Sequence, residues 1–369
     1  MSETPLAAKL KARIARDGPI GVADYMHACL SDPEHGYYRR QTAIGAAGDF
    51  VTAPEISQVF GELIGLWCAV VWRQMGSPGR LHLVELGPGR GTLMRDALRA
   101  TRIVPGFRDA LSVHLVDSNA TLRKIQETTL ADTGVPIAFH EEAAEALTLA
   151  SRIPDGPTVI VANEFLDALP ISQFVFVGGR WCARHVDVSG DGFAFVPDLA
   201  RASAPLVVPS ALTPQEGDIR EVCAHHTLYA DTLFATRARR GPLAALFVDY
   251  GHAKTGFGDT LQGVAGQAHV SPFHAPGETD LSAQVDFEQF AAACLSAGLA
   301  ADGPLPQAEF LGRLGLVERT SRLMAANPER AAEIEAGALR LMAPTGMGSR
   351  FLAVGVRSDD MAPLPGFGP

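Results

Sequence analysis

From residue 81 onward the chain alternates short apolar runs with longer stretches in which apolar residues recur every three or four positions. Short apolar runs bounded by turn residues are typical of strands, and the three-to-four spacing is typical of helices that pack on one face. Because parallel strands need a crossover connection, usually a helix, the alternation predicts an α/β fold with a doubly wound, mostly parallel sheet. The predicted strands lie at or within residues 81–86, 111–117, 135–140, 157–170, 243–251 and 349–357.

Two regions depart from this alternation. Residues 4–30 carry apolar positions at helical spacing, and Asp-Gly-Pro at 17–19 should end one helix and start another. Gly178 and Gly179 predict a hairpin, and a Pro/Ala/Ser-rich stretch follows them. We therefore expect a helical N-terminal extension that serves as a lid, and a Rossmann-like core with an insertion after its fourth strand. The expected bounds are 1–78 for the extension, 79–369 for the core and about 171–230 for the insertion.

Composition narrows the classes of function. The formal net charge is −10 and no cluster of Lys and Arg stands out, which disfavours nucleic acid as a partner. The five cysteines are scattered, with no Cys or His partner at metal-ligand spacing, so no metal site is expected. No run of residues predicts a secretory signal or insertion into a membrane. The expected location is the cytoplasm, and the preference for Arg over Lys suggests a bacterium with a GC-rich genome.

The first predicted strand runs into the glycine-rich sequence VELGPGRGTL, residues 84–93. Glycines between a strand and a helix let the backbone turn tightly and approach a ligand closely. The spacing is Gly-x-Gly-x-Gly and Thr92 follows, which departs from the dinucleotide-binding fingerprint. The sequence instead resembles motif I of the class I S-adenosylmethionine-dependent methyltransferases, in which an acidic residue, here Glu85, precedes the glycines.

Two further strand ends carry polar residues. The second predicted strand ends in Asp117. Its carboxylate could accept hydrogen bonds from two ribose hydroxyls, or it could cap the helix that follows. The fourth ends in Asn163 and Glu164, where polar groups are costly unless they are paired or used. Glu142, after the third strand, could reach an adenine edge or could favour a helix N-terminus.

A resemblance to one family rests on six strings that occur in the family's order and together cover almost the whole chain. The strings are GDFVTAPEISQVFGELIG, VELGPGRGTLMRDAL, ANEFLDALP, FVDYGH, PGETDLSAQVDF and MGSRFLAVG. They resemble the MidA family of methyltransferases, which includes mitochondrial assembly factors of respiratory complex I. The resemblance implies a class I methyltransferase core, S-adenosylmethionine as cofactor, and a protein substrate. In the mitochondrial members that substrate is an arginine on a core subunit of complex I, so a hydrophilic subunit of complex I is the candidate partner.

The candidate site residues fall into two groups. The cofactor-binding candidates are Glu85, Gly87, Gly89, Gly91, Thr92, Asp117, Ser118, Glu142, Asn163, Asp49 and Thr52. The catalytic candidates are Glu164, Asp167 and Glu55. A protonated guanidinium is a poor nucleophile, and a carboxylate can fix its plane and receive its proton.

Alternatives stay open at this point. Asp167 could be a carboxylate at the start of a helix, and Glu55 could complement the dipole of a helix begun by Pro54. The whole protein could be a non-catalytic assembly factor that keeps the cofactor pocket for stability. A nicotinamide-dependent oxidoreductase would also explain the glycine loop and Asp117, but neither Thr92 nor the polar end of the fourth strand.

Overall fold

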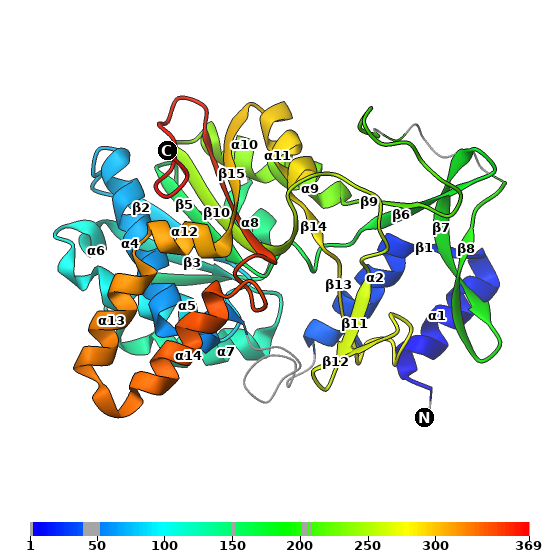
Figure 1. The fold of residues 1–369 in the computed structure, drawn as a ribbon, viewed down its shortest axis with the longest axis horizontal. Coiled ribbons are helices and arrows are strands. Elements are labelled where there is room, and N and C mark those ends of the chain that lie inside the picture. Colours follow the sequence, from blue (N-terminus) through cyan, green and yellow to red (C-terminus); the bar gives the residue numbers. More distant parts are fainter. Residues whose placement is uncertain (1–2, 40–51, 149–151, 201–205, 207, 369) are drawn as a thin grey trace. The chain divides into compact units, whose positions relative to one another are not determined.

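A computed structural model describes residues 3–39, 52–148, 152–200, 206 and 208–368 (Figure 1). The chain forms two compact units, each assembled from separate segments. We call Ile44–Leu166, Thr227–Ala253 and Val285–Pro369 the core unit, and Met1–Ala43, Asp167–His226 and Lys254–Gln284 the accessory unit. Among the described residues, no helix has the length and apolarity needed to cross a membrane.

The core unit contains an eight-stranded sheet with the order β15-β16-β10-β5-β2-β3-β4, and β14 pairs with β10 beside it. The strands from β10 to β4 run parallel, whereas β16 is antiparallel to both of its neighbours, β10 and β15. The bounds are β2 Leu81–Leu86, β3 Leu111–Val116, β4 Ile137–His140, β5 Thr158–Asn163, β10 Leu243–His252, β14 Val285–Asp286, β15 Leu299–Pro306 and β16 Phe351–Ser358. Parallel strands buried on both faces read as continuous apolar runs, and β2 is buried at every position.

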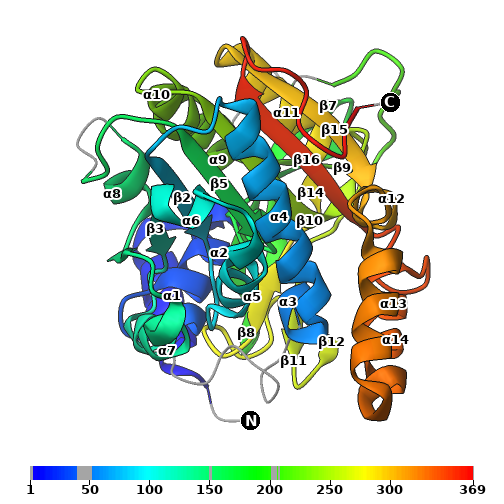
Figure 2. The ribbon, with the colours of Figure 1, turned by 90° about the vertical axis from the view of Figure 1, so that its left-hand side faces the viewer.

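Helices cover this sheet, and two of them pack unusually closely. Figure 2 shows α4 (Gln58–Gln74) in front of the sheet with α5 (Thr92–Ala100) beside it. A Cβ atom at Gly65 would lie 2.5 Å from the Cα atom of Ala97, so only glycine permits this approach. The other core-unit helices are α3 Ala53–Ile56, α6 Phe107–Ala110, α7 Ala120–Leu130, α8 Ala143–Leu147, α10 Ala235–Ala238, α11 Phe287–Ser296, α12 Gln307–Arg313, α13 Leu316–Ala326 and α14 Ala331–Met342.

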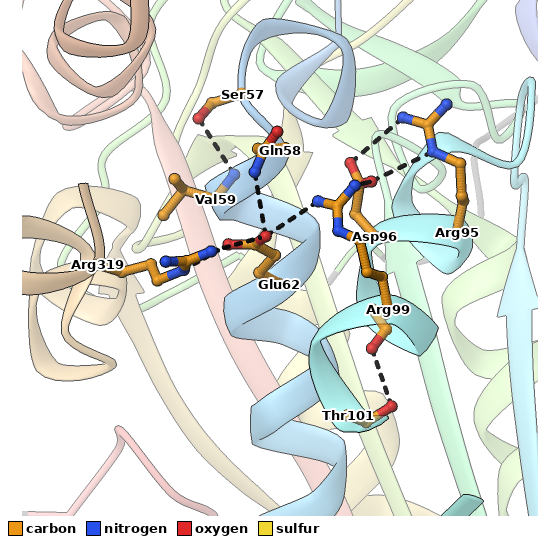
Figure 3. Close-up of polar contacts among 10 residues, drawn as sticks. Ser57, Gln58, Val59, Glu62, Arg95, Asp96, Arg99, Thr101 and Arg319 are labelled. Atoms are coloured by element: carbon orange, nitrogen blue, oxygen red, sulfur yellow. Dashed lines mark hydrogen bonds and ion pairs between the residues drawn. The ribbon is translucent and has the colours of Figure 1, made fainter. Parts of the chain in front are cut away.

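An ion-pair network joins three of these helices (Figure 3). Glu62 on α4 is only 3% exposed, and its carboxylate accepts hydrogen bonds from Arg99 on α5 and from both Nε and Nη2 of Arg319 on α13. Arg99 also lies 3.1 Å from Asp96. The network therefore ties the pair α13 and α14, which lie side by side, to the helices that cover the sheet.

The accessory unit combines the N-terminal helices with antiparallel strands. One sheet has the order β1-β7-β6-β9 with β8 paired to β7, and a second has the order β12-β11-β13. The bounds are α1 Pro5–Asp17, β1 Ile20–Gly21, α2 Val22–Ser31, β6 Ser172–Val177, β7 Arg180–Ser189, β8 Gly192–Pro197, β9 Ile219–Val222, β11 Gln262–Ala265, β12 Ala268–Val270 and β13 Asp280–Ser282. A further short helix, α9 (Ala224–Leu228), begins in this unit and ends in the core unit.

The structure confirms the predicted α/β class and shifts several boundaries. The fourth strand is confined to Thr158–Asn163, and the chain turns directly after it. The hairpin at Gly178 and Gly179 is present, and both glycines have positive φ, as a two-residue hairpin turn requires. The strand β15 was missed because Gly303 and Pro304 interrupt its apolar pattern, which an edge strand with a bulge tolerates. The extension over 1–78 and its role as a lid stay predictions; α1 and α2 belong to the accessory unit and α4 to the core unit.

Candidate functional site

The glycine loop lies at the carboxyl end of β2, as predicted. Gly87, Gly89 and Gly91 have φ values of 65°, 53° and 81°, a region that side chains with a Cβ atom adopt at a cost. A Cβ atom at Gly87 would lie 3.1 Å from Cδ2 of Phe165, so the loop also approaches the turn after β5 closely. α5 begins at Thr92, and the loop therefore connects a buried strand to the first N–H groups of a helix, which have no partner within the helix.

A buried carboxyl group, Glu85, lies near the end of β2, and a half-buried one, Asp117, directly follows β3. Glu85 is 3% exposed, and burial followed by the charge of Asp117 raises the pKa of Glu85 to about 8. Burial also raises the pKa of Asp117 to about 6, against hydrogen bonds from Asn119 and Gln126 that lower it. Within the described part of the chain, Oε2 of Glu85 is buried without a hydrogen-bond partner. A buried acceptor of this kind suits a cationic or hydrogen-bonding ligand.

The capping alternative for Asp117 is wrong. Asn119 is the N-cap residue of α7, and its side chain accepts hydrogen bonds from the N–H groups of Thr121 and Leu122. Asp117 instead accepts from the N–H of Asn119 through Oδ1 and from Nε2 of Gln126 through Oδ2. The half-buried Ser118 lies between them.

Gln126 is a residue that the sequence analysis missed. It is fully buried on α7, and its Nε2 donates both to the carbonyl oxygen of Gly89, at 2.8 Å, and to Asp117, at 2.9 Å. One amide thus joins the glycine loop to the carboxylate after β3. The only signal in the sequence is a polar residue on the buried face of an amphipathic helix, which by itself does not indicate a binding role.

The turn after β5 holds Glu164 in an unusual backbone conformation. Its φ is 52°, in the left-handed region that costs a non-glycine residue about 1 kcal/mol or more. Oε1 of Glu164 accepts hydrogen bonds from the N–H of Ala53, at 3.1 Å, and from Nδ2 of Asn163, at 3.0 Å. In the described residues, Oδ1 of Asn163 is buried without a partner.

The short helix α3 contacts both the turn after β5 and the start of α5. The N–H of Ala53 at its start donates to Glu164, and Glu55 accepts a 2.6 Å hydrogen bond from the Thr92 hydroxyl at the start of α5. Glu55 therefore does more than complement the dipole of its own helix. Thr52 precedes α3 without a side-chain capping bond, and Asp49 lies outside the described residues.

The remaining two candidates are Asp167 and Glu142. Asp167 belongs to the accessory unit, where its backbone carbonyl accepts from the N–H of Ala283. No helix begins at Asp167, so that alternative is wrong; the residue lies in a turn. Glu142 is exposed at the N-cap position of α8 and makes no side-chain capping bond there.

The geometry fits a specific cofactor. A parallel sheet with a glycine loop after its first strand, an acidic residue after its second and a polar end on its fourth defines a class I S-adenosylmethionine-dependent methyltransferase. Glu85 and Asn163 each have a buried acceptor with no partner among the residues that the structure describes, and such acceptors suit a ligand with cationic and hydroxyl groups. Glu85 and Asp117 with the three loop glycines are the residues that would hold it.

Comparison with known proteins identifies the family. A family model for S-adenosyl-L-methionine-dependent methyltransferases matches residues 63–305. The mitochondrial protein arginine methyltransferase NDUFAF7 homolog of Drosophila melanogaster is 38% identical, over 94% of this chain and 83% of its own. The human protein arginine methyltransferase NDUFAF7, also mitochondrial, is 34% identical over 94% of this chain and 82% of its own.

A solved structure agrees with these relatives. A crystal structure of a protein from Burkholderia thailandensis, bound to S-adenosyl-homocysteine, has a TM-score of 0.83 and 26% identity, covering 98% of this chain and 94% of that one. The chain belongs to the MidA family of S-adenosylmethionine-dependent methyltransferases. The nicotinamide-dependent oxidoreductase that the sequence left open is therefore set aside.

The expected cytoplasmic location is corrected by the same comparison. The curated relatives are named as mitochondrial proteins, which contradicts the location inferred from the N-terminal sequence. The absence of a secretory signal and of a long apolar run does not distinguish the cytoplasm from other compartments, which is why that inference was wrong.

Proposed function

We propose that this protein transfers a methyl group from S-adenosylmethionine to an arginine side chain of a protein substrate. Two relatives that match over most of the chain are named protein arginine methyltransferases, which supports an arginine acceptor. The observation that carries the proposal is Glu164, a carboxylate with left-handed backbone at the carboxyl end of β5. Backbone strain of this kind recurs at functional sites, because selection for folding alone would favour glycine or asparagine there.

The chemistry needs such a carboxylate. One guanidinium nitrogen gains the methyl group and loses a proton, while the sulfonium of the cofactor becomes a neutral thioether. Proximity and alignment supply most of the acceleration. A carboxylate can orient the guanidinium plane through hydrogen bonds, concentrate its positive charge on one side, and receive the proton. The donors Ala53 N–H and Asn163 Nδ2 fix the orientation of the Glu164 carboxylate.

The other site residues have supporting roles in this proposal. Glu55 stabilises the start of α5 through Thr92, which makes it a positioning residue for the glycine loop. Asp117 and Glu85, with Ser118 and Asn163, hold the cofactor. Asp49, Thr52 and Glu142 remain candidates for cofactor contact, and Asp167 remains a candidate for contact with the substrate.

Substitution of Glu164 by Gln tests the proposal. Glutamine keeps the shape but loses the charge, so we expect methyl transfer to fall by a factor of about 10² or more, with S-adenosylmethionine binding retained. Binding is measured by calorimetry and turnover by radiolabelled methyl transfer. The matched control is Glu329→Gln, which changes an exposed glutamate and should alter neither quantity. Undiminished turnover in Glu164→Gln would remove Glu164 from this role.

The acceptor protein is the finer part of the proposal. The family resemblance implies a core hydrophilic subunit of respiratory complex I. Mass spectrometry of those subunits, prepared with and without this protein, should reveal an arginine whose methylation depends on it. If the subunits bind this protein but repeatedly gain no label, the non-catalytic assembly factor becomes the better account.

A further inference from the structure

Asp249 is a buried carboxylate next to the proposed catalytic residue. It lies near the end of β10, is only 1% exposed, and follows Val248, whose carbonyl oxygen accepts a 2.9 Å hydrogen bond from the N–H of Glu164. Burying a carboxylate costs several kcal/mol unless hydrogen bonds compensate for the lost hydration. The buried carboxylate of Asp249 therefore needs hydrogen-bond donors that compensate for its lost hydration.

Two of these donors come from the turn after β5. Oδ2 of Asp249 accepts hydrogen bonds from the N–H groups of Phe165, at 3.0 Å, and of Leu166, at 2.8 Å. Oδ1 accepts from the N–H of Tyr250, at 2.9 Å. Successive N–H groups that converge on one oxygen form an anion-binding nest, a backbone shape that a left-handed residue such as Glu164 helps to create.

These bonds clamp the backbone of Glu164 on both sides. Its own N–H bonds to Val248, and the next two N–H groups bond to Asp249. The three bonds offset the strain of the left-handed conformation. Without the Asp249 carboxylate, the turn would relax toward ordinary backbone angles, and the Glu164 side chain would move relative to Ala53 and Asn163.

We infer that Asp249 is a positioning residue for methyl transfer, which holds the strained turn that presents Glu164 to the substrate. The inference rests on the proposed function, because it takes the orientation of Glu164 as the quantity that matters. The alternative is that Asp249 stabilises the fold alone, as buried carboxylates with several donors often do. The two readings differ in what the loss of Asp249 does to the rate once cofactor and substrate are bound.

The experiment uses the full-length protein with Asp249→Asn. An amide oxygen can still accept from Phe165 and Leu166, but the amide NH₂ would face the Tyr250 N–H, and the charge is lost. We expect kcat to fall by roughly 10 to 10², because small displacements of catalytic groups have effects of this size. The cofactor Kd and the acceptor KM should stay within about threefold of their original values, because the bound cofactor is held mainly by other residues.

A double variant separates positioning from stability. If Asp249 acts through Glu164, then Glu164→Gln with Asp249→Asn should lose no more activity than Glu164→Gln alone. The matched control is Asp96→Asn, which changes another carboxylate that is 1% exposed and lies in an ion-pair cluster on α5. That control should lower the unfolding midpoint and leave kcat unchanged.

Each outcome decides the matter. Additive losses in the double variant, an unchanged kcat in Asp249→Asn, or a loss of cofactor binding that accounts for the whole effect would overturn the inference. These results leave the proposed function intact as long as Glu164→Gln is inactive. If Glu164→Gln itself turns over normally, the proposed function fails, and the inference fails with it.

Discussion

At the scale of single residues, the site depends on carboxyl groups that the fold buries wholly, as at Glu85 and Asp249, or in part, as at Asp117. Glu85, Asp117 and Asp249 come from three adjacent or nearby parallel strands, and each lies at or near the carboxyl end of its strand. Their environments differ. Asp249 is surrounded by backbone donors, whereas Glu85 has one oxygen without a partner in the described structure. Glu85 is therefore the group whose charge should respond most to a bound ligand.

Cofactor binding should release a proton from Glu85. Its pKa of about 8 lies above the ordinary value, so the group is mostly protonated at pH 7, and a cationic ligand favours its ionised form. We expect roughly 0.5 to 1 proton to be released per cofactor at pH 7, measured by calorimetry in buffers of different ionisation enthalpy. Glu85→Gln should remove the buffer dependence. Equal binding enthalpies in all buffers would contradict the prediction.

The residue types at this site were largely predictable from the sequence, but their partners were not. The glycines, Asp117 and Glu164 stand at strand ends where the alternation of strands and helices predicts a ligand site. Gln126 and Asp249 could not be chosen, because their roles depend on hydrogen bonds to Gly89 and to the turn after β5. Those contacts join segments far apart in the chain, and no local pattern encodes them.

At the scale of elements, α3 and α13 show how short segments are fixed by a few polar bonds. α3 has only four residues, too few for a helix to be stable alone, and its bonds to Glu164 and Thr92 supply what its length does not. α13 is fastened by Arg319, which forms two hydrogen bonds with Glu62 of α4 (Figure 3). Because two nitrogens of the Arg319 guanidinium donate to the one carboxylate of Glu62, the ion pair has a defined orientation.

Removal of Glu62 should destabilise the core unit. Glu62→Ala leaves Arg99 and Arg319 without their shared carboxylate, and we expect a loss of about 2 kcal/mol in the free energy of unfolding, measured with urea. The loss should be smaller than for a fully buried pair because Arg99 and Arg319 are 41% and 35% exposed. The control Glu309→Ala breaks an exposed pair with Arg313 one turn away and should not change the transition measurably. Equal losses in the free energy of unfolding for the two variants would show that the Glu62 network stabilises the protein no more than an exposed ion pair does.

At the scale of the whole sheet, three histidines form a hydrogen-bonded row across neighbouring strands. His82 Nδ1 lies 3.3 Å from His114 Nε2, and His114 Nδ1 lies 3.1 Å from His140 Nε2. Burial lowers the pKa of all three, to about 4 for His82 and about 3 for His114. Arg237, Arg80 and Arg240 lower the pKa of His82 further, and Arg152 acts on His140 against the opposite effect of Glu145.

This row should make the protein less stable in mild acid. The folded-state pKa values lie below the ordinary value near 6.5, so the unfolded chain takes up protons first as the pH falls. The contribution of each histidine is complete above pH 6.5 and is lost as the pH falls, toward pH 4 for His82 and pH 3 for His114, by up to about 1.4 kcal/mol per pH unit. Urea midpoints at pH 7 and pH 5 measure the loss.

The comparison of variants isolates the histidines from other groups. Glu85 and Asp117 act in the opposite sense, because their raised pKa values make the folded state relatively more stable as the pH falls. His114→Gln should therefore reduce the drop in midpoint between pH 7 and pH 5, whereas His269→Gln, at an exposed position, should not. An unchanged drop in His114→Gln would rule out the row as its source.

The sequence by itself determined the class of fold, the family and the place of the cofactor loop, because strand and helix periodicity and glycine spacing are properties of neighbouring residues. It also marked Glu164 as a polar residue at the end of a buried strand. Tertiary structure alone decided that Glu164 adopts a left-handed conformation, that the N–H of Ala53 donates to its carboxylate, that Asp249 accepts from the next two residues, and that Asp167 belongs to the other unit. The physical reason is that these features arise from hydrogen bonds and packing between distant segments, which exist only once the chain has folded.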